Sequence, residues 1–196
     1  HNPLLNHNLL INPAMEVCQR VVDPSVGWSV ADNSYGVADR FKLLSSGSTV
    51  ESSRATGTTA KRLVLKNDTG SSNRFAAIQV VSGANSRPYR SQTMIAFAHL
   101  LCSQTKNARI ALLEWTGTED APTTDVVNNW SSSTFTTGNF FLGSNLTVVG
   151  TAQVALTANT LAQVSISGSV SASCKNLIWM VWTEDTISSN ATFEIE

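Results

Sequence analysis

Apolar residues alternate with polar ones, or run together, over nine short stretches of the chain. The stretches are residues 38–44, 61–67, 74–81, 91–103, 108–115, 145–150, 162–170, 176–184 and 191–196. Clusters of Gly, Asn, Ser and Thr separate them, as in "NDTGSSN" and "SGANSRP". Short strands punctuated by turn residues are typical of all-β proteins. About nine or ten strands in a chain of 196 residues predict a two-sheet antiparallel jelly-roll sandwich.

Three stretches are apolar at successive positions instead of alternating: "MIAFAHLLC" (94–102), "IALLEW" (110–115) and "LIWMVW" (177–182). A strand of this kind is apolar on both faces, and both faces then need a cover. One face is expected to pack in the core of the sandwich. The other requires a loop, a ligand or a neighbouring subunit, so we expect either a homo-oligomer or a loop folded over the sheet.

The rest of the chain predicts no convincing helix and no domain boundary. Residues 119–132 ("EDAPTTDVVNNWSS") are a candidate for one short helical turn that Asp125 would cap, although Thr, Val and Asn are weak helix formers. No internal repeat or low-complexity linker interrupts the sequence. We therefore expect a single jelly-roll domain over residues 9–196, with residues 1–8 as a connector or N-terminal arm.

Composition and charge argue against several classes of function. The net charge is -1, so no basic field would draw the chain to nucleic acid or to acidic lipid. No apolar stretch reaches the roughly 18–20 residues of a membrane span, and no membrane insertion is expected. Cys18, Cys102 and Cys174 form neither a C-x-x-C motif nor a disulfide framework. Two of them could pair, but we expect buried free thiols, which fits folding in a reducing cytosol.

Motifs for catalysis are not found in the sequence. It contains no H-E-x-x-H, G-x-S-x-G, Walker A or G-x-G-x-x-G pattern. His99 is expected to be a core or interface histidine and not a catalytic base. Carboxylates for glycoside hydrolysis would come from Asp39, Glu114 and Glu184, but their spacing selects no pair. The sequence therefore predicts a protein that is not an enzyme.

Two pairs of adjacent acidic residues could supply oxygen ligands to a structural calcium ion. They are Glu184–Asp185 and Glu119–Asp120. Neither pair belongs to a D-x-[DN]-x-[DN]-G loop. No other cofactor is expected.

The chain opens on an apolar run, "NLLINPAMEVCQR" (8–20). A secretion signal is not expected, because the run lacks a basic n-region and an A-x-A end, and Asn8, Asn12 and Pro13 interrupt it. Asn12 precedes a proline, which restricts its backbone to extended or turn geometry. We expect the run to lie as an extended segment against the core.

This opening run, followed by "YGVADRFKL" (35–43), resembles the start of a domain found at or near the C-terminus of many bacteriophage tail fibres and related virion proteins. The family often reads N-x-[LI]-[IL]-N-G-x-[MF]-x-[IVW]-x-Q-R, then a tyrosine, then a-D-R-[WF]. Pro13 replaces the usual glycine, whereas the matching positions are Met15, Gln19, Arg20, Asp39, Arg40 and Phe41. Residues 91–130 and 176–186 are similar to later parts of the same domains.

The resemblance implies a carbohydrate-binding-module-like jelly roll on a fibre or capsid, assembled as a homotrimer and in contact with other virion proteins. It also implies host attachment through a bacterial surface polysaccharide. Such a protein folds in the cytoplasm of the bacterial host and acts on the virion. The motif itself is expected to be a structural frame and not a binding site.

A physical role for the motif residues is available. Asn8 and Asn12 would bridge backbone groups where the first segment meets the sandwich. Asp39 and Arg40, on either side of the core aromatic Phe41, would pair with charges of the opening run. These contacts would stabilise the fold.

Glycan sites combine an exposed aromatic ring with nearby amides, carboxylates or arginines, because the ring stacks on C–H faces while polar groups take the hydroxyls. Trp115, Trp179 and Trp182 lie in apolar stretches and are expected in the core or an interface. The candidate sites are Trp130 with Asn128 and Asn129, and in second place Trp28 with Asp32 and Tyr35. In each case the alternative is an aromatic residue that holds its own loop on the sandwich.

The leading interpretation is a non-enzymatic phage virion protein, from a tail fibre, tailspike or capsid fibre, that recognises a bacterial cell-surface glycan. One alternative is a purely structural domain that decorates a capsid or caps and trimerises a fibre. A second is a carbohydrate-binding module of a bacterial glycoside hydrolase. A third is a depolymerase with carboxylates at a subunit interface.

Overall fold

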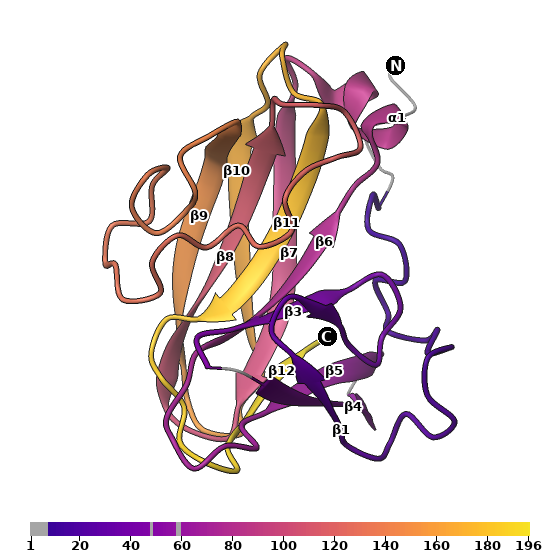
Figure 1. Cartoon of the computed structure of the whole chain (residues 1–196), viewed down its shortest axis with the longest axis vertical. Coiled ribbons are helices and arrows are strands. Elements are labelled where there is room, and N and C mark those ends of the chain that lie inside the picture. The colour runs from indigo at the N-terminus through magenta and orange to yellow at the C-terminus, as the bar shows by residue number, and fades with distance from the viewer. Residues whose placement is uncertain (1–7, 48, 58–59) are drawn as a thin grey trace.

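Two antiparallel six-stranded sheets pack face to face in the computed structural model, which describes residues 8–47, 49–57 and 60–196 (Figure 1). The first, called the β7 sheet, has the order β1 (Trp28–Ala31), β4 (Thr49–Thr56), β5 (Lys61–Lys66), β12 (Thr192–Ile195), β7 (Thr93–Cys102) and β10 (Ala162–Ser169). The second, called the β11 sheet, has the order β2 (Ser34–Tyr35), β3 (Lys42–Ser45), β6 (Phe75–Val80), β11 (Asn176–Thr183), β8 (Lys106–Trp115) and β9 (Leu146–Leu156). The predicted jelly-roll sandwich is confirmed.

Each of the nine predicted stretches overlaps one strand, but three further strands were not predicted. These are β1, β2 and β4. Strand β4 reads "TVESSRAT", a polar pattern that the sequence does not distinguish from a turn, and β2 has only two residues. Residues 1–7 of the expected connector, with His1 and His7, lie outside the described residues.

The short helical turn was predicted in the wrong part of the chain. Residues 119–132 contain no helical turn. A four-residue helix, α1 (Gly83–Ser86), forms instead within the predicted turn "SGANSRP" and continues into a 3₁₀ turn (Arg87–Tyr89). The hydroxyl of Ser82 caps α1 by accepting the backbone N–H of Asn85. No helix among the residues described is long and apolar enough to cross a membrane.

Strand β11 is buried at every position, and its two faces belong to two different cores. Leu177, Trp179 and Val181 face the interior of the sandwich. The residues between them, such as Met180 and Trp182, point to the opposite side and join a second apolar cluster. This division follows from the two-residue period of a strand, which turns successive side chains to opposite faces.

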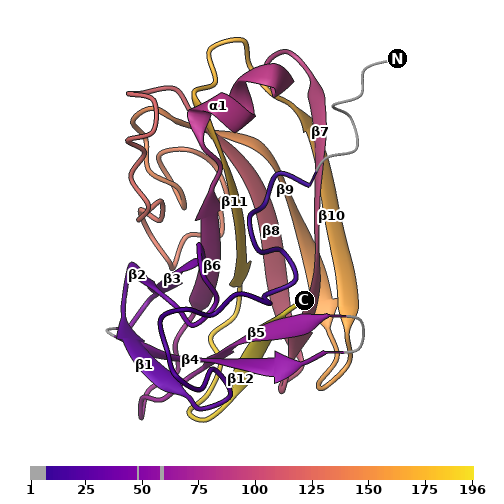
Figure 2. The ribbon, with the colours of Figure 1, turned by 90° about the vertical axis from the view of Figure 1, so that its right-hand side faces the viewer.

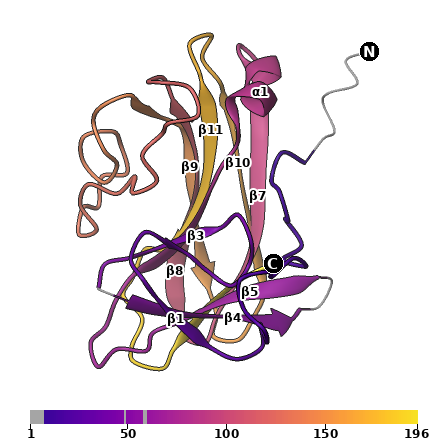
Figure 3. The same ribbon diagram turned by 45° about the vertical axis from the view of Figure 1, so that its right-hand side comes forward.

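A long loop, residues 116–145, closes the outer face of the β11 sheet, where Figure 3 shows it beside β9 and β11. Its side chains Val126, Phe140 and Phe141 are buried against the sheet. The Phe140 ring stacks on Trp182, with 5.1 Å between centroids and 22° between planes. The sequence predicted a loop, a ligand or a neighbouring subunit over this face, and the structure shows a loop.

The opening run forms an N-terminal arm, residues 8–20, that contains no strand (Figure 2). The Asn12 side chain accepts the backbone N–H of Val17 at 2.9 Å and donates to the carbonyl of Val17 at 2.8 Å. The amide of Gln79 exchanges two hydrogen bonds with the backbone of Ile11, at 2.6 and 2.8 Å. Met15 is 2% exposed and anchors the arm in the core. The expected structural role is confirmed for Asn12, whereas Asn8 accepts only the backbone N–H of Leu10 within the arm, at 3.0 Å. The pairing expected of Arg40 is not found, because no carboxylate of the described residues lies at ion-pair distance from it.

Turn geometry and one ion pair complete this frame. Asn12 has a φ of 59°, so the backbone before Pro13 turns in the left-handed region and does not run extended. Asp39 lies 3.8 Å from the Arg20 guanidinium and also accepts the backbone N–H of Gln19. The Asn12 amide reaches the carbonyl of Asp39 at 3.3 Å, which joins the arm to the turn before β3.

The three thiols are free, as expected, and they differ in exposure. Cys102 and Cys174 are buried, whereas Cys18 on the arm is half-buried. Burial raises the pKa of Cys174 to about 11 and also raises the pKa of Cys102 and Cys18. Because the thiolate is the reactive form, all three thiols are protected at neutral pH.

We predict that a disulfide reagent at pH 8 modifies Cys18 of the native protein first. Cys102 and Cys174 should react about a hundredfold more slowly, because they are buried and hold their protons. Replacing Asn12→Ala should loosen the arm and speed the reaction of Cys18 alone. Stopped-flow absorbance with mass mapping measures the three rates, and unfolded protein, in which all three react, is the control. Equal native rates would contradict the prediction.

Candidate functional site

The best sequence candidate, Trp130 with Asn128 and Asn129, lies on the loop that covers the β11 sheet. The Trp130 ring is half-buried and packs edge-on against Phe140, with 5.9 Å between centroids. Asn128 donates to the carbonyl of Asn139 at 3.0 Å, and Asn129 accepts a backbone N–H of the same loop. These residues hold their own loop, as the alternative interpretation expects, and a sugar contact at Trp130 stays a prediction.

The second candidate set lies on the segment that connects the two sheets, with Trp28 on β1 and Tyr35 on β2. Both rings are exposed, by 39% for Trp28 and 41% for Tyr35. Asp32 accepts the backbone N–H of Ser45 at 2.8 Å and so fixes the turn between the two strands. Of the three residues, Tyr35 lines a surface groove and the other two do not.

This groove, called the Tyr35 groove, has a volume of about 320 Å³ and combines a small apolar floor with a polar rim. Ile78 and Val80 of β6 form part of the floor, and Ile11 of the arm lines one side. Polar residues from β2, β3, β6, the turns before β3 and α1, and the long loop also line it; they are Tyr35, Arg40, Lys42, Gln79, Ser82, Asp120 and Thr124. Convergent polar groups beside an exposed ring are the usual composition of a sugar site.

Positive charge gathers around the Tyr35 ring. The Arg20 guanidinium lies 4.4 Å from the ring centroid, and the Lys42 ammonium lies 5.2 Å from it. The Lys42 ammonium donates to the hydroxyl of Thr124 at 2.9 Å, a neutral acceptor. Within the described ranges, neither Lys42 nor the exposed Arg40 has a carboxylate at ion-pair distance. A half-buried ammonium without a counter-charge favours an anion beside it.

Asp120 also lines the groove and is fixed by three hydrogen bonds. Its carboxylate accepts the backbone N–H of Gly83 at 2.6 Å and the amide N–H of Asn176 at 2.8 Å. Its own backbone N–H donates to the Asn176 oxygen at 3.0 Å. Donation from Gly83 and then from Asn176 lowers the pKa of Asp120, so this carboxylate is ionised at neutral pH.

Sequence reasoning named Tyr35 but missed the residues that surround it. Arg40 and Lys42 stand on either side of the buried Phe41, so the alternation of polar and apolar residues already places both on the surface. No local signal joins them to Ser82 and Asp120, which reach the groove through the packing of α1 and the long loop.

The carboxylates considered for catalysis or calcium are engaged by protein donors. Glu184 pairs with Arg109 at 2.7 Å, and Glu119 pairs with Arg87 at 2.6 Å. Glu114 is 4% exposed and accepts a backbone N–H at 2.8 Å. Backbone N–H groups also reach the remaining two, Asp39 and Asp185. Across the described part of the chain, no group of three His, Cys, Asp or Glu residues could hold a metal ion.

His99 lies on the outer face of the β7 sheet and is half-buried. Its ring packs edge-on against Phe97, with 6.2 Å between centroids. His99 was expected in the core or in an interface. The structure does not place it in the core, and a place in an interface stays a prediction.

No protein-family model matches the chain, and no curated protein matches it. Solved structures with a similar fold include the carbohydrate-binding module TmCBM61 in complex with β-1,4-galactotriose, at 11% identity and a TM-score of 0.48, with 97% of this chain and 94% of that chain covered. The CBM22-1–GH10 modules of Clostridium thermocellum xylanase 10B with xylohexaose match at 10% identity and a TM-score of 0.48, over 89% of this chain and 28% of that chain.

A phage protein is also among the similar structures. The enzymatically active domain of tailspike protein 4 from bacteriophage CBA120 matches at 10% identity and a TM-score of 0.44, over 81% of this chain and 18% of that chain. At these sequence identities and TM-scores, the similarity concerns the backbone fold and not the function.

We predict that Asn176→Ala raises the pKa of Asp120 towards the ordinary value of a carboxyl group. The substitution removes an N–H donor that favours the charged form, while the donor from Gly83 remains. Side-chain carboxyl resonances followed by NMR through an acid titration measure the shift. Asp23, whose pKa is lowered by hydrogen bonds from Ser25, is the internal control and should not move. An unchanged Asp120 would contradict this account of the groove wall.

Proposed function

We propose that the chain is a non-enzymatic glycan-binding module and that the Tyr35 groove holds the sugar. The observation that carries the proposal is the exposed Tyr35 ring at the edge of a groove rimmed by hydroxyl, carboxylate and cationic groups. The ring can stack on the C–H face of a sugar. Ser82, Thr124 and Asp120 can then take its hydroxyls.

The charges of the groove favour a sugar with an acidic substituent. Lys42 and Arg40 present cations with no carboxylate partner among the described residues. A carboxylate on the sugar would complete the interactions of Lys42, which already holds the hydroxyl of Thr124. The fixed negative charge of Asp120 would repel the acidic group, which would then lie beside Lys42.

The finer part of the proposal places the module on a phage virion, as a tail-fibre, tailspike or capsid-fibre domain that attaches to a host polysaccharide. Its support is the resemblance of the opening motif, whose Asn12 and Asp39 fix the arm here. We also propose a homotrimer that contacts other virion proteins, folds in the host cytoplasm and acts on the virion. A decoration domain without a ligand would bind no glycan in the experiment below. A module of a glycoside hydrolase is the alternative that would bind one as well.

We predict that the chain binds β-1,4-linked oligomannuronate more tightly than the neutral β-1,4-mannan oligomer of the same length, within a wider glycan array. The two probes differ in a carboxylate, so Lys42→Met should weaken the acidic probe about tenfold, which is about 1.4 kcal/mol, and remove the preference. Tyr35→Ala should weaken both probes by a similar factor, because the stacking ring is lost. Calorimetry measures the affinities, and added salt should weaken the acidic probe more.

Trp130→Ala and Trp28→Ala are matched aromatic controls that lie outside the groove and should bind as the parent does. Binding lost in Trp130→Ala but kept in Tyr35→Ala would place the site on the long loop and contradict the proposal. A trimer by light scattering that binds no glycan on the array would favour the decoration role instead.

A further inference from the structure

Strand β7 is paired over most of its length on one edge and over a short part on the other. Strand β10 pairs with it over Thr93–Leu100, whereas β12 pairs with it over Leu100–Cys102. One further residue pair extends the β12 side: His99 and Glu196 exchange two backbone hydrogen bonds, at 3.2 and 2.9 Å. Beside residues 93–98 the described part of the chain provides no strand on this side, which is called the β7 edge (Figure 2).

The backbone groups of Ile95 and Phe97 point to the β7 edge. In an antiparallel ladder, residues that exchange both hydrogen bonds with one neighbouring strand recur at every second position. His99 exchanges both bonds with the β12 side, so Phe97 and Ile95 direct their N–H and C=O groups to that side as well. Within the described residues neither has a backbone partner there. The alternate residues, Ala96 and Ala98, direct their groups to β10.

The β7 edge lacks the features that normally protect a free strand. Proteins cover such an edge, keep it short, or place charge, proline or a bulge on it. Residues 93–98 read "TMIAFA" and contain no charged residue, proline or glycine. Ile95 and Phe97 are 71% and 54% exposed. An open row of donors and acceptors of this kind is a template for another strand.

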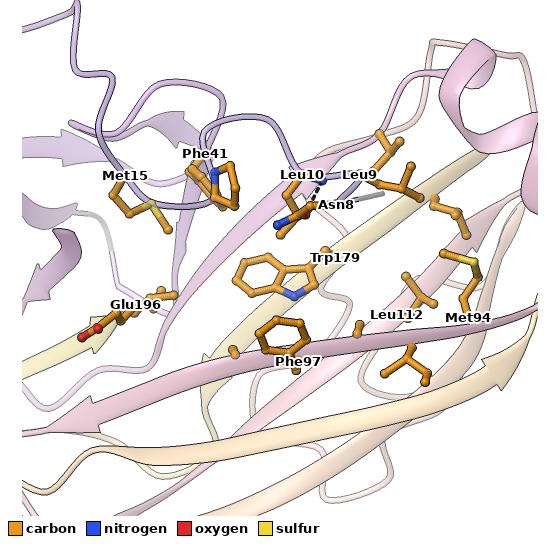
Figure 4. Close-up of a pocket in the computed structure, with 17 residues that line it drawn as sticks. Asn8, Leu9, Leu10, Met15, Phe41, Met94, Phe97, Leu112, Trp179 and Glu196 are labelled. Atoms are coloured by element: carbon orange, nitrogen blue, oxygen red, sulfur yellow. Dashed lines mark hydrogen bonds between the residues drawn. The ribbon is translucent and has the colours of Figure 1, made fainter. Parts of the chain in front are cut away.

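A cavity of about 370 Å³ separates the β7 edge from the N-terminal arm (Figure 4). Residues 94–98 of β7 line it on one side, and Leu9 and Leu10 of the arm line it on the other. Most of its remaining walls are apolar, and Asn8 and Glu196 are the polar exceptions. The arm therefore passes the β7 edge without pairing with it and leaves space between them.

The cavity has room for the inward side chains of an added strand. Successive side chains of a strand point to opposite faces, so every second residue of such a strand would enter the cavity. The others would lie at the surface beside Ile95 and Phe97. On the inner face of β7, the small residues Ala96 and Ala98 leave the space. An apolar cavity of about 150 Å³ holds benzene, so this one is large enough for two apolar side chains.

Strand β12 shows which sequence pattern suits this side of β7. Its residues Phe193 and Ile195 are buried in the core, and Glu194 between them lies on the outer face. The outward residues are those that exchange hydrogen bonds with β7, as Glu196 does with His99. A strand added further along the same side meets the same requirement: polar residues that form the backbone bonds, and apolar residues between them that point inward.

We propose that the β7 edge binds an extended peptide segment of a partner protein as an additional antiparallel strand. Alternate polar residues of the segment exchange backbone hydrogen bonds with Ile95 and Phe97, and its apolar residues enter the cavity. In recognition of this kind the main chain provides affinity, and pockets for alternate side chains provide specificity. The site does not depend on the proposed glycan function.

The test uses the peptide acetyl-KTVTVTK-amide, whose valines alternate with threonines. The control peptide acetyl-KTTVVTK-amide has the same composition without the alternation. Backbone amides of the intact ¹⁵N-labelled chain are followed by NMR and by hydrogen exchange. In the free chain, the N–H groups of Ile95 and Phe97 should exchange faster than those of Ala96 and Ala98, which are paired with β10.

The alternating peptide should shift the amides of Ile95 and Phe97 and slow their exchange. The control peptide should bind roughly tenfold more weakly, because only one of its valines can point into the cavity.

Ile95→Pro removes an N–H that points to the β7 edge and leaves the pairing with β10 intact, since an edge strand accepts proline on its unpaired side. It should weaken the alternating peptide roughly three- to tenfold, as the loss of one hydrogen bond does. Ile95→Thr is the matched control: it keeps the N–H and a β-branched side chain, and it should bind as the parent does. Tyr35→Ala, in the groove, should also bind the peptide as the parent does.

Ala96→Phe places a ring in the cavity and should abolish peptide binding, and it tests the site even if Ile95→Pro does not fold. Three results would overturn the proposal: unchanged amides of Ile95 and Phe97 with the alternating peptide, equal affinity of the two peptides, or unchanged binding in both Ile95→Pro and Ala96→Phe.

Slow exchange of Ile95 and Phe97 in the free chain would also contradict a partner peptide. If light scattering then shows self-association that Ile95→Pro abolishes, a second copy occupies the β7 edge. If the protection is instead lost in the double variant Leu4→Ser, Leu5→Ser, the chain's own first residues occupy it.

Discussion

Burial of β11 on both faces is the constraint on which the rest of the structure depends. Trp179 and Val181 require the β7 sheet on one side, and Met180 and Trp182 require a cover on the other. The loop 116–145 supplies this cover with Phe140 and its neighbours. The loop therefore covers this outer face over β11 and β8. The open surface with converging polar groups lies beside it, over Ile78 and Val80 of β6, where the loop and β3 meet around Tyr35.

The N-terminal arm covers a second part of the fold that the strands leave open. The sandwich is open along one edge of β7, and the arm is held across that opening by the side chains of Asn12 and Gln79. Neighbouring residues of the arm border two different cavities: Ile11 lines the Tyr35 groove, and Leu10 lines a cavity beside β7 and β11. The opening motif thus has a structural role next to the candidate site.

Sequence patterns predicted the strands whose burial requires apolar residues. They did not predict the strands in which polar residues are tolerated. The run of β11 is apolar on both faces, which predicted a strand and a cover over its outer face. The pattern did not indicate whether a loop or a neighbouring subunit provides this cover. Strand β4 was missed because polar residues occupy both of its faces: Glu51 lies on the outer face of the β7 sheet, whereas Ser52 is fully buried on the inner face. Tyr35 was named from its surroundings, whereas Asp120 is placed in the groove by Asn176, which is 56 positions away in the sequence.

The loop 116–145 stabilises the fold by burying the outer face of β11. The free energy of unfolding of Phe141→Ala tests this most directly. Phe141 is fully buried in the second core, so urea denaturation should show a loss of about 3–5 kcal/mol. Phe97→Ala, at a ring that is 54% exposed, is the matched control and should cost about 1 kcal/mol or less. A loss in Phe141→Ala no larger than that of the control would contradict the account, because the outer face of β11 would then be stable without its loop.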